Sequence, residues 1–146
     1  IAAIGVATHE AGHAIQHATS YAALGLRSAL VPTVGIGSQF GTLAMAIGAG
    51  LAAGGSLLGK GVFLLGALLF GCVVLFQLVT LPVEFDASNR ARKLVVEAGI
   101  VDSDERTGID RVLQAAALTY VAAAISSILT LIYFLIRSGL LNGRDE

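Results

Sequence analysis

The stretch GVFLLGALLFGCVVLFQLVTL, residues 61–81, decides the fold of this chain because it runs for 21 residues without a charged side chain. About 20 apolar residues in a helix cross about 30 Å of hydrocarbon, so this stretch is typical of a membrane span. Two further uncharged stretches predict spans near residues 40–58 and 115–136. We expect an all-α integral membrane bundle with about three transmembrane helices, formed as a single domain over residues 1–146.

Residues between these stretches set the expected ends of the spans. Pro32, Gly35 and Gly37 predict a loop ahead of the first span, and Lys60 marks a short turn after it. Pro82 is expected to end the second span, because proline lacks the backbone N–H that a helix interior needs.

The polar segment 83–111 is expected to lie at the membrane surface. Its first part, 83–98, predicts a short membrane-proximal helix. The charged run 102–111 reads as a capped and solvated lead-in to the third span. Upstream, residues 1–26 are expected to form one helix.

The composition agrees with a membrane protein. Charged residues make up 13% of the chain, against roughly a quarter in soluble domains, and 55% are hydrophobic. The net charge is −1 and the chain has no basic tract that would indicate nucleic acid, so we expect no nucleic-acid partner. Cys72 is the single cysteine, so an intrachain disulfide is impossible. The chain opens on Ile1 with no basic leader, and we expect that an N-terminal segment is missing.

Glycine is concentrated in and before the first two spans. Eleven of the 18 glycines fall between Gly35 and Gly71. Small faces let helices approach closely in lipid, so these spans are expected to pack as a tight hairpin. The competing interpretation is a flexible glycine-rich linker.

Basic residues predict the orientation. Residues 1–26 and 83–111 lie two crossings apart and therefore on one side of the membrane. That side holds six of the nine basic residues, so by the positive-inside rule we expect it to face the cytoplasm. The six are Arg27, Arg90, Arg92, Lys93, Arg106 and Arg111. The expected membrane is a bacterial plasma membrane.

The sequence His9-Glu10-Ala11-Gly12-His13 is an HExxH motif in a segment that reads as helix. A helix turns about 100° per residue, so His9 and His13 share a face and can both bind one Zn²⁺. Glu10 lies beside the pair and can take a proton from a zinc-bound water as a general base. The alternative is a pair of helical histidines with ordinary hydrogen bonds.

A catalytic zinc needs a third protein ligand from the same side of the membrane. Glu84 and Asp86 are the favoured acids because the expected helix 83–98 can lie against the HExxH helix. Each could instead be a first-turn acid stabilised by the helix dipole. The remaining candidates for the third ligand are Glu97, Asp102, Asp104, Glu105, Asp110 and His17.

Four segments carry a resemblance to a known family: HEAGHAIQH at 9–17, LVP at 30–32, LPVEFDAS at 81–88 and AAALTYVA at 115–122. In order and spacing they resemble the neutral zinc metallopeptidase family. That resemblance implies an integral-membrane peptidase with one zinc per chain and a further membrane segment upstream.

The segment at 84–88 also resembles the Glu-Phe-x-Ala-Asp motif of membrane-embedded gluzincin peptidases. This resemblance implies that Glu84 is the third zinc ligand. The chain departs from it at Ser88, where the pattern has an aspartate that orients a zinc-bound histidine. We therefore expect Asp86 or an upstream group to supply that carboxylate.

Other polar residues have weaker readings. His17 lies about 6 Å further along the helix than His13, so it is expected to line the site rather than bind the metal. Tyr120 could stabilise an oxyanion, although a tyrosine near a membrane interface is expected anyway. Arg27, Asn89 and Arg90 could orient substrate or contact lipid headgroups.

Together these features predict a zinc-dependent membrane endopeptidase that acts on peptides or membrane proteins, with the lipid bilayer as its surroundings. Its expected ligands are His9, His13 and Glu84, and its base is Glu10. The alternative is a metal-binding membrane scaffold or chaperone without peptidase activity. A transporter is disfavoured because none of the three spans holds an ionisable acid or base of the kind that transport pathways use.

Overall fold

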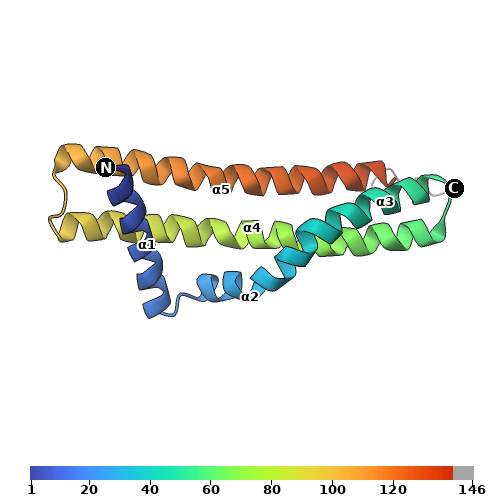
Figure 1. Ribbon diagram of the computed structural model, residues 1–146, viewed down its shortest axis with the longest axis horizontal. Helices are drawn as coiled ribbons and strands as arrows, with labels where there is room; N and C mark the ends of the chain where they lie inside the picture. Colours follow the sequence, from blue (N-terminus) through green and yellow to red (C-terminus); the bar gives the residue numbers. More distant parts are fainter. Residues whose placement is uncertain (140–146) are drawn as a thin grey trace. The chain divides into compact units, whose positions relative to one another are not determined.

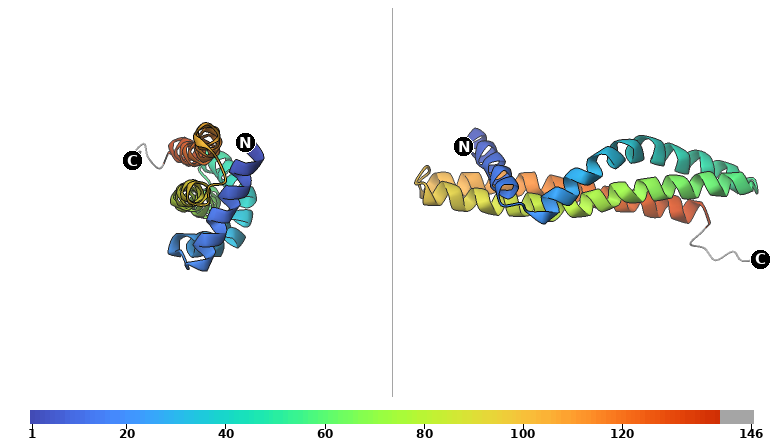
Figure 2. Two further views of the ribbon diagram at one scale, coloured as in Figure 1. Left: turned by 90° about the vertical axis from the view of Figure 1, so that its left-hand side faces the viewer. Right: turned by 90° about the horizontal axis from the view of Figure 1, so that it is seen from below.

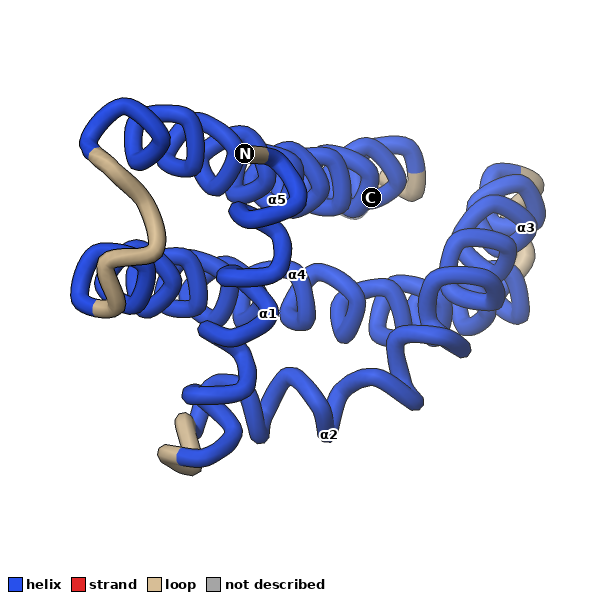
Figure 3. The backbone as a smooth tube through the Cα atoms, turned by 60° about the vertical axis from the view of Figure 1, so that its left-hand side comes forward, coloured by secondary structure: helices blue, strands red, loops and turns tan. Residues whose placement is uncertain are grey.

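The structure is a computed structural model, and it describes residues 1–139. All regular structure in this range is helical, which confirms the all-α prediction (Figures 1 and 3). The elements in chain order are α1 (Ala2–Ala18), α2 (Ala22–Ile36), a π-helical turn η1 (Gly37–Gly41), α3 (Thr42–Ala53), α4 (Leu57–Glu97) and α5 (Ser103–Arg137).

Three segments within the described residues are long and apolar enough to cross a membrane. Only 11–22% of the residues in their most apolar windows are buried by the chain itself. Apolar side chains left exposed on this scale require an apolar environment, and a bilayer supplies one. The segments are Ala22–Ala53, Leu57–Glu97 and Asp104–Arg137.

The chain divides into two compact units, each described by itself below. Unit 1 comprises Ile1–Ser28 and Leu78–Ala123, and unit 2 comprises Ala29–Gln77 and the chain from Ala124 onward. The single domain over 1–146 stays a prediction.

In unit 1, the second half of α4 and the first half of α5 run antiparallel, and α1 lies across them (Figures 1 and 2). Their core is small and apolar: Ala91, Val95, Ile109 and Leu113 are buried together, with Val101 packed against them. The Asp102 carboxylate accepts hydrogen bonds from the backbone N–H groups of Asp104 and Glu105, so α5 begins with a side-chain cap, as expected from the sequence.

In unit 2, glycines let α3 and α4 approach at backbone distance. A Cβ added at Gly48 would lie 2.3 Å from the Phe63 nitrogen, and one at Gly66 would lie 2.6 Å from the Met45 nitrogen. Met45, Phe63, Phe70 and Val73 form the buried core beside this contact. The tight glycine-faced hairpin is therefore confirmed, and the flexible linker is excluded.

Both prolines lie inside helices, so the predicted loop at Pro32 and the predicted helix end at Pro82 are wrong. α2 continues through Pro32 where a loop was expected, and α4 continues through Pro82 where the second span was expected to end. An interior proline costs about 3 kcal/mol in an isolated helix. Packing outweighs that cost at Pro82, because the next two residues, Val83 and Glu84, are fully buried.

The expected helix over 1–26 is also interrupted. α1 ends at Ala18, and Ser20 has a positive φ of 52° in the turn that precedes α2. The Thr19 hydroxyl donates to the Ile15 carbonyl, a local bond of the kind that competes with helix continuation.

Candidate metal centre

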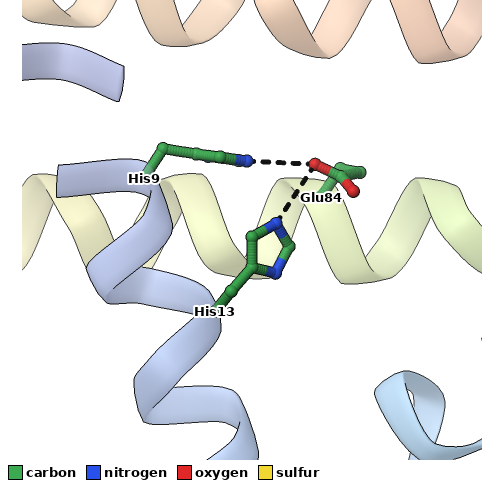
Figure 4. A group of neighbouring side chains, drawn as sticks. All are labelled: His9, His13 and Glu84. Atoms are coloured by element: carbon green, nitrogen blue, oxygen red, sulfur yellow. Dashed lines mark hydrogen bonds and ion pairs between the residues drawn. The ribbon is translucent and has the colours of Figure 1, made fainter. Parts of the chain in front are cut away.

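Three side chains from α1 and α4 converge within unit 1 (Figure 4). Nε2 of His9 lies 3.0 Å from Glu84 Oε2, and Nε2 of His13 lies 3.5 Å from the same oxygen. The two imidazole rings are 4.7 Å apart and nearly perpendicular. The structure therefore brings together the three residues that the sequence singled out as metal ligands.

The donor set fits a zinc ion. With bonds of about 2.0–2.2 Å and tetrahedral angles, the ligand atoms of a zinc site lie about 3.3–3.6 Å apart. The ligand atoms of His9, His13 and Glu84 all lie within 4.8 Å of one another. Glu84 is 1% exposed, and its Oε1 is buried without a hydrogen-bond partner. A buried carboxylate is costly unless it is paired, and a metal ion bound at Oε2 would add to the ion pair that Arg27 forms with Oε1.

The position of Glu84 in α4 removes one alternative. Since α4 begins at Leu57, Glu84 lies deep inside the helix and far from its N-terminus. The helix dipole acts only within the first turn, so it cannot account for Glu84 or for Asp86.

Gly12, inside the HExxH motif, sets the distance between α1 and α4. A Cβ at this position would lie 2.3 Å from the Ala87 carbonyl oxygen and 2.9 Å from its carbon. Only glycine allows backbones to approach this closely. The histidines flank this contact on α1, so they reach Glu84 from a neighbouring helix.

His13 is held from behind by Gln16. Nδ1 of His13 lies 2.9 Å from Gln16 Oε1, and Gln16 is 0% exposed. The Gln16 amide donates to the Val83 carbonyl oxygen at 2.7 Å and to Asp86 Oδ2 at 2.8 Å. Asp86 therefore acts on the histidine through an amide. Sequence reasoning missed Gln16, although its place three residues after His13 puts both on one helix face.

His9 is held by Ser88. The Ser88 hydroxyl lies 3.2 Å from His9 Nδ1 and is buried. Serine therefore occupies the place where the gluzincin pattern has an aspartate. A hydroxyl both donates and accepts, so this contact suits either neutral tautomer of the ring.

Two further polar groups reach Glu84. Arg27 Nη2 lies 3.5 Å from Glu84 Oε1, and the Arg27 Nε is buried without a hydrogen-bond partner. The Tyr120 side chain interacts with the Glu84 carboxylate, and the charges of Arg27 and Glu10 also act on it. Both α2 and α5 thus contribute a hydrogen-bond donor to the edge of the site.

Glu10 is exposed, beside the histidines on α1. It makes no hydrogen bond or ion pair with any of the residues that the structure describes. Its role as the general base stays a prediction.

The other candidate ligands lie elsewhere in unit 1. Asp86 pairs with Arg90 Nε at 2.6 Å, and Asp110 pairs with Arg92 Nε at 2.9 Å. Asp102 caps α5, and its N–H lies 3.3 Å from Glu105 Oε2. Within residues 1–139, the potential metal group contains none of the remaining candidates, which are Glu97, Asp104 and His17.

Comparison with known proteins agrees with this donor set. Residues 1–139 match the model of a family described as "Putative neutral zinc metallopeptidase". The whole chain is 48% identical, over 147 residues, to a Bacillus subtilis (strain 168) protein named "Putative membrane protease YugP". The chain spans 61% of the length of that relative. No solved structure matches the chain.

Proposed function

The chain belongs to the neutral zinc metallopeptidase family, and from that membership and the site geometry we propose that it is a zinc-dependent membrane endopeptidase. The observation that carries the proposal is the convergence of His9, His13 and Glu84, with the exposed Glu10 next to His9 in α1. A base next to a three-ligand zinc site is the arrangement that peptide hydrolysis needs.

Zinc, when bound, supplies a Lewis acid that polarises a peptide carbonyl and lowers the pKa of water from about 15.7 toward about 7. Glu10 then takes the proton of the attacking water and passes it to the leaving amine. The buried Glu84 carboxylate interacts with both histidines and keeps their Nε2 atoms close to its own Oε2.

Arg27 and Tyr120 are assigned the role of orienting the substrate carbonyl. Both lie beside Glu84, and both are hydrogen-bond donors. The partly buried guanidinium also balances the charge of the buried Glu84 carboxylate.

The proposed substrates are peptides or membrane proteins that reach the site from the bilayer or the cytoplasm. Three helical segments among the described residues are long and apolar enough to anchor the chain in a membrane. The bias of basic residues supports the proposal that the site lies on the cytoplasmic side of a bacterial plasma membrane.

A metal-binding scaffold would close its zinc site with a fourth protein ligand. Among residues 1–139, the group that could hold the ion has three members, and His17 is not one of them. A site with three ligands leaves one position for substrate or water, which favours hydrolysis.

The test is Glu10→Gln in the whole protein in detergent, with zinc content measured alongside an unbiased peptide-cleavage screen. We expect stoichiometric zinc and a loss of turnover of at least about a hundredfold. Glu97→Gln is the matched control, because Glu97 is an exposed acid outside the metal group. Equal cleavage by the wild type and Glu10→Gln would refute the assignment of the base.

A further inference from the structure

The amide of Gln16 has only one orientation that satisfies its three neighbours. Two of them, the Val83 carbonyl oxygen and Asp86 Oδ2, accept hydrogen bonds and cannot donate. Both must therefore face the NH₂ group of the amide, at 2.7 and 2.8 Å. The carbonyl oxygen of Gln16 is left facing His13.

This orientation dictates where the His13 ring carries its proton. Gln16 Oε1 lies 2.9 Å from His13 Nδ1, and an amide oxygen can only accept. The hydrogen bond forms only if Nδ1 is protonated. In the neutral ring Nε2 is then bare, and Nε2 is the nitrogen that faces Glu84.

We infer that Gln16 is a positioning residue that keeps the His13 proton on Nδ1, so that Nε2 is ready to bind the metal. Without it, the Glu84 carboxylate, 3.5 Å from Nε2, would attract the proton to the nitrogen that must bind zinc. This inference rests on the proposed zinc site.

The surroundings of Gln16 prevent its side-chain amide from flipping. Gln16 is 0% exposed, so water does not compete for its hydrogen bonds. Asp86 is held in turn by Arg90, whose Nε donates to the same carboxylate oxygen at 2.6 Å. Hydrogen bonds therefore connect Arg90 to Asp86, Asp86 to Gln16 and Gln16 to His13. This network fixes the proton of the His13 ring on Nδ1.

The two histidines are consequently set in different ways. The Ser88 hydroxyl, 3.2 Å from His9 Nδ1, can donate or accept and leaves the His9 proton free to move. His9 Nε2 can therefore carry the proton and donate it to Glu84 when no metal is bound. The same nitrogen can lose that proton and bind the metal when one is present. His13 has no such freedom.

The test compares two substitutions with opposite chemistry. Gln16→Glu keeps an oxygen acceptor toward His13, but it replaces the NH₂ donor that faces the Val83 carbonyl oxygen and Asp86 with a second oxygen acceptor. Gln16→Met removes every hydrogen bond at similar volume. We expect Gln16→Glu to be the less stable variant in thermal unfolding, yet to hold zinc more tightly than Gln16→Met, whose affinity falls about 10–100-fold.

Zinc affinity is measured on the whole protein in detergent by titrating Zn²⁺ against a competing chelator. The matched control is Gln114→Met, the same change at an exposed position on α5, and we expect it to keep wild-type affinity. If Gln16 only joins α1 to α4, zinc affinity follows stability and Gln16→Glu binds more weakly than Gln16→Met. That order would overturn the inference.

A second measurement is independent of zinc and of variant stability. Nitrogen NMR of the metal-free, histidine-labelled wild type, at a pH where the ring is neutral, reports which nitrogen of His13 is protonated. We expect Nδ1–H, and a protonated Nε2 would overturn the inference. A wild type that binds no zinc would refute the proposed function, while this spectrum would still decide the role of Gln16.

Discussion

The Gly12→Ala substitution tests how the fold builds the site. The added Cβ would lie 2.3 Å from the Ala87 carbonyl oxygen, where ordinary contact begins at 3.4 Å. Backbone atoms on α4 cannot swing aside, so α1 must move away by about 1 Å. Metal sites tolerate errors of only about 0.2 Å in ligand distance, and His9 and His13 move with α1.

The expected result is a loss of zinc affinity of at least about a hundredfold. The change in stability is small by comparison, because overpacking costs about 1–3 kcal/mol and alanine recovers about 1 kcal/mol of helix propensity. A folded protein with a weakened metal site is therefore the predicted phenotype.

The assay is competitive Zn²⁺ titration of the purified protein, with thermal unfolding recorded on the same samples. Gly71→Ala is the matched control, since a Cβ there meets nothing within 4 Å. We expect this control to bind zinc as the wild type does. Wild-type zinc affinity in Gly12→Ala would refute the reasoning, because the ligands would then not depend on the close approach of α1 to α4.

Two further predictions concern the metal and unit 2. Removing zinc with a chelator is expected to lower the thermal unfolding temperature, because zinc at a hundred times its Kd stabilises the folded state by about 2.7 kcal/mol. Glu84→Gln should show no such response to the chelator. A wild type whose unfolding temperature does not change with the chelator would contradict this prediction. Gly48→Ala brings a Cβ to 2.3 Å from the Phe63 nitrogen, so we expect it to lower the free energy of unfolding by about 1–3 kcal/mol. Zinc affinity should stay unchanged. A parallel loss of zinc binding would show that the two units are coupled.

The sequence was sufficient for the features that depend on local pattern. Uncharged stretches of span length predicted the membrane helices, and the i, i+4 spacing put His9 and His13 on one face. The concentration of glycine between Gly35 and Gly71 predicted the close approach of α3 to α4, which the structure confirms at Gly48 and Gly66.

Features that depend on tertiary packing could not be predicted in this way. Pro82 reads as a helix end from its own chemistry, yet burial of Val83 and Glu84 carries α4 through it. Glu84 could be proposed from motif resemblance, but its convergence with the histidines needs the fold. Gln16 was missed because its hydrogen bonds to Val83 and Asp86 join residues about 70 positions apart.

The most direct test of the central claim is X-ray absorption at the zinc edge of the stoichiometrically loaded protein. We expect two imidazoles and oxygen donors around the zinc ion, with bonds of about 2.0–2.2 Å and no sulfur. Loss of one imidazole in His9→Ala would assign that ring. A third imidazole, a sulfur ligand, or failure to retain one zinc per chain would contradict a centre built from His9, His13 and Glu84.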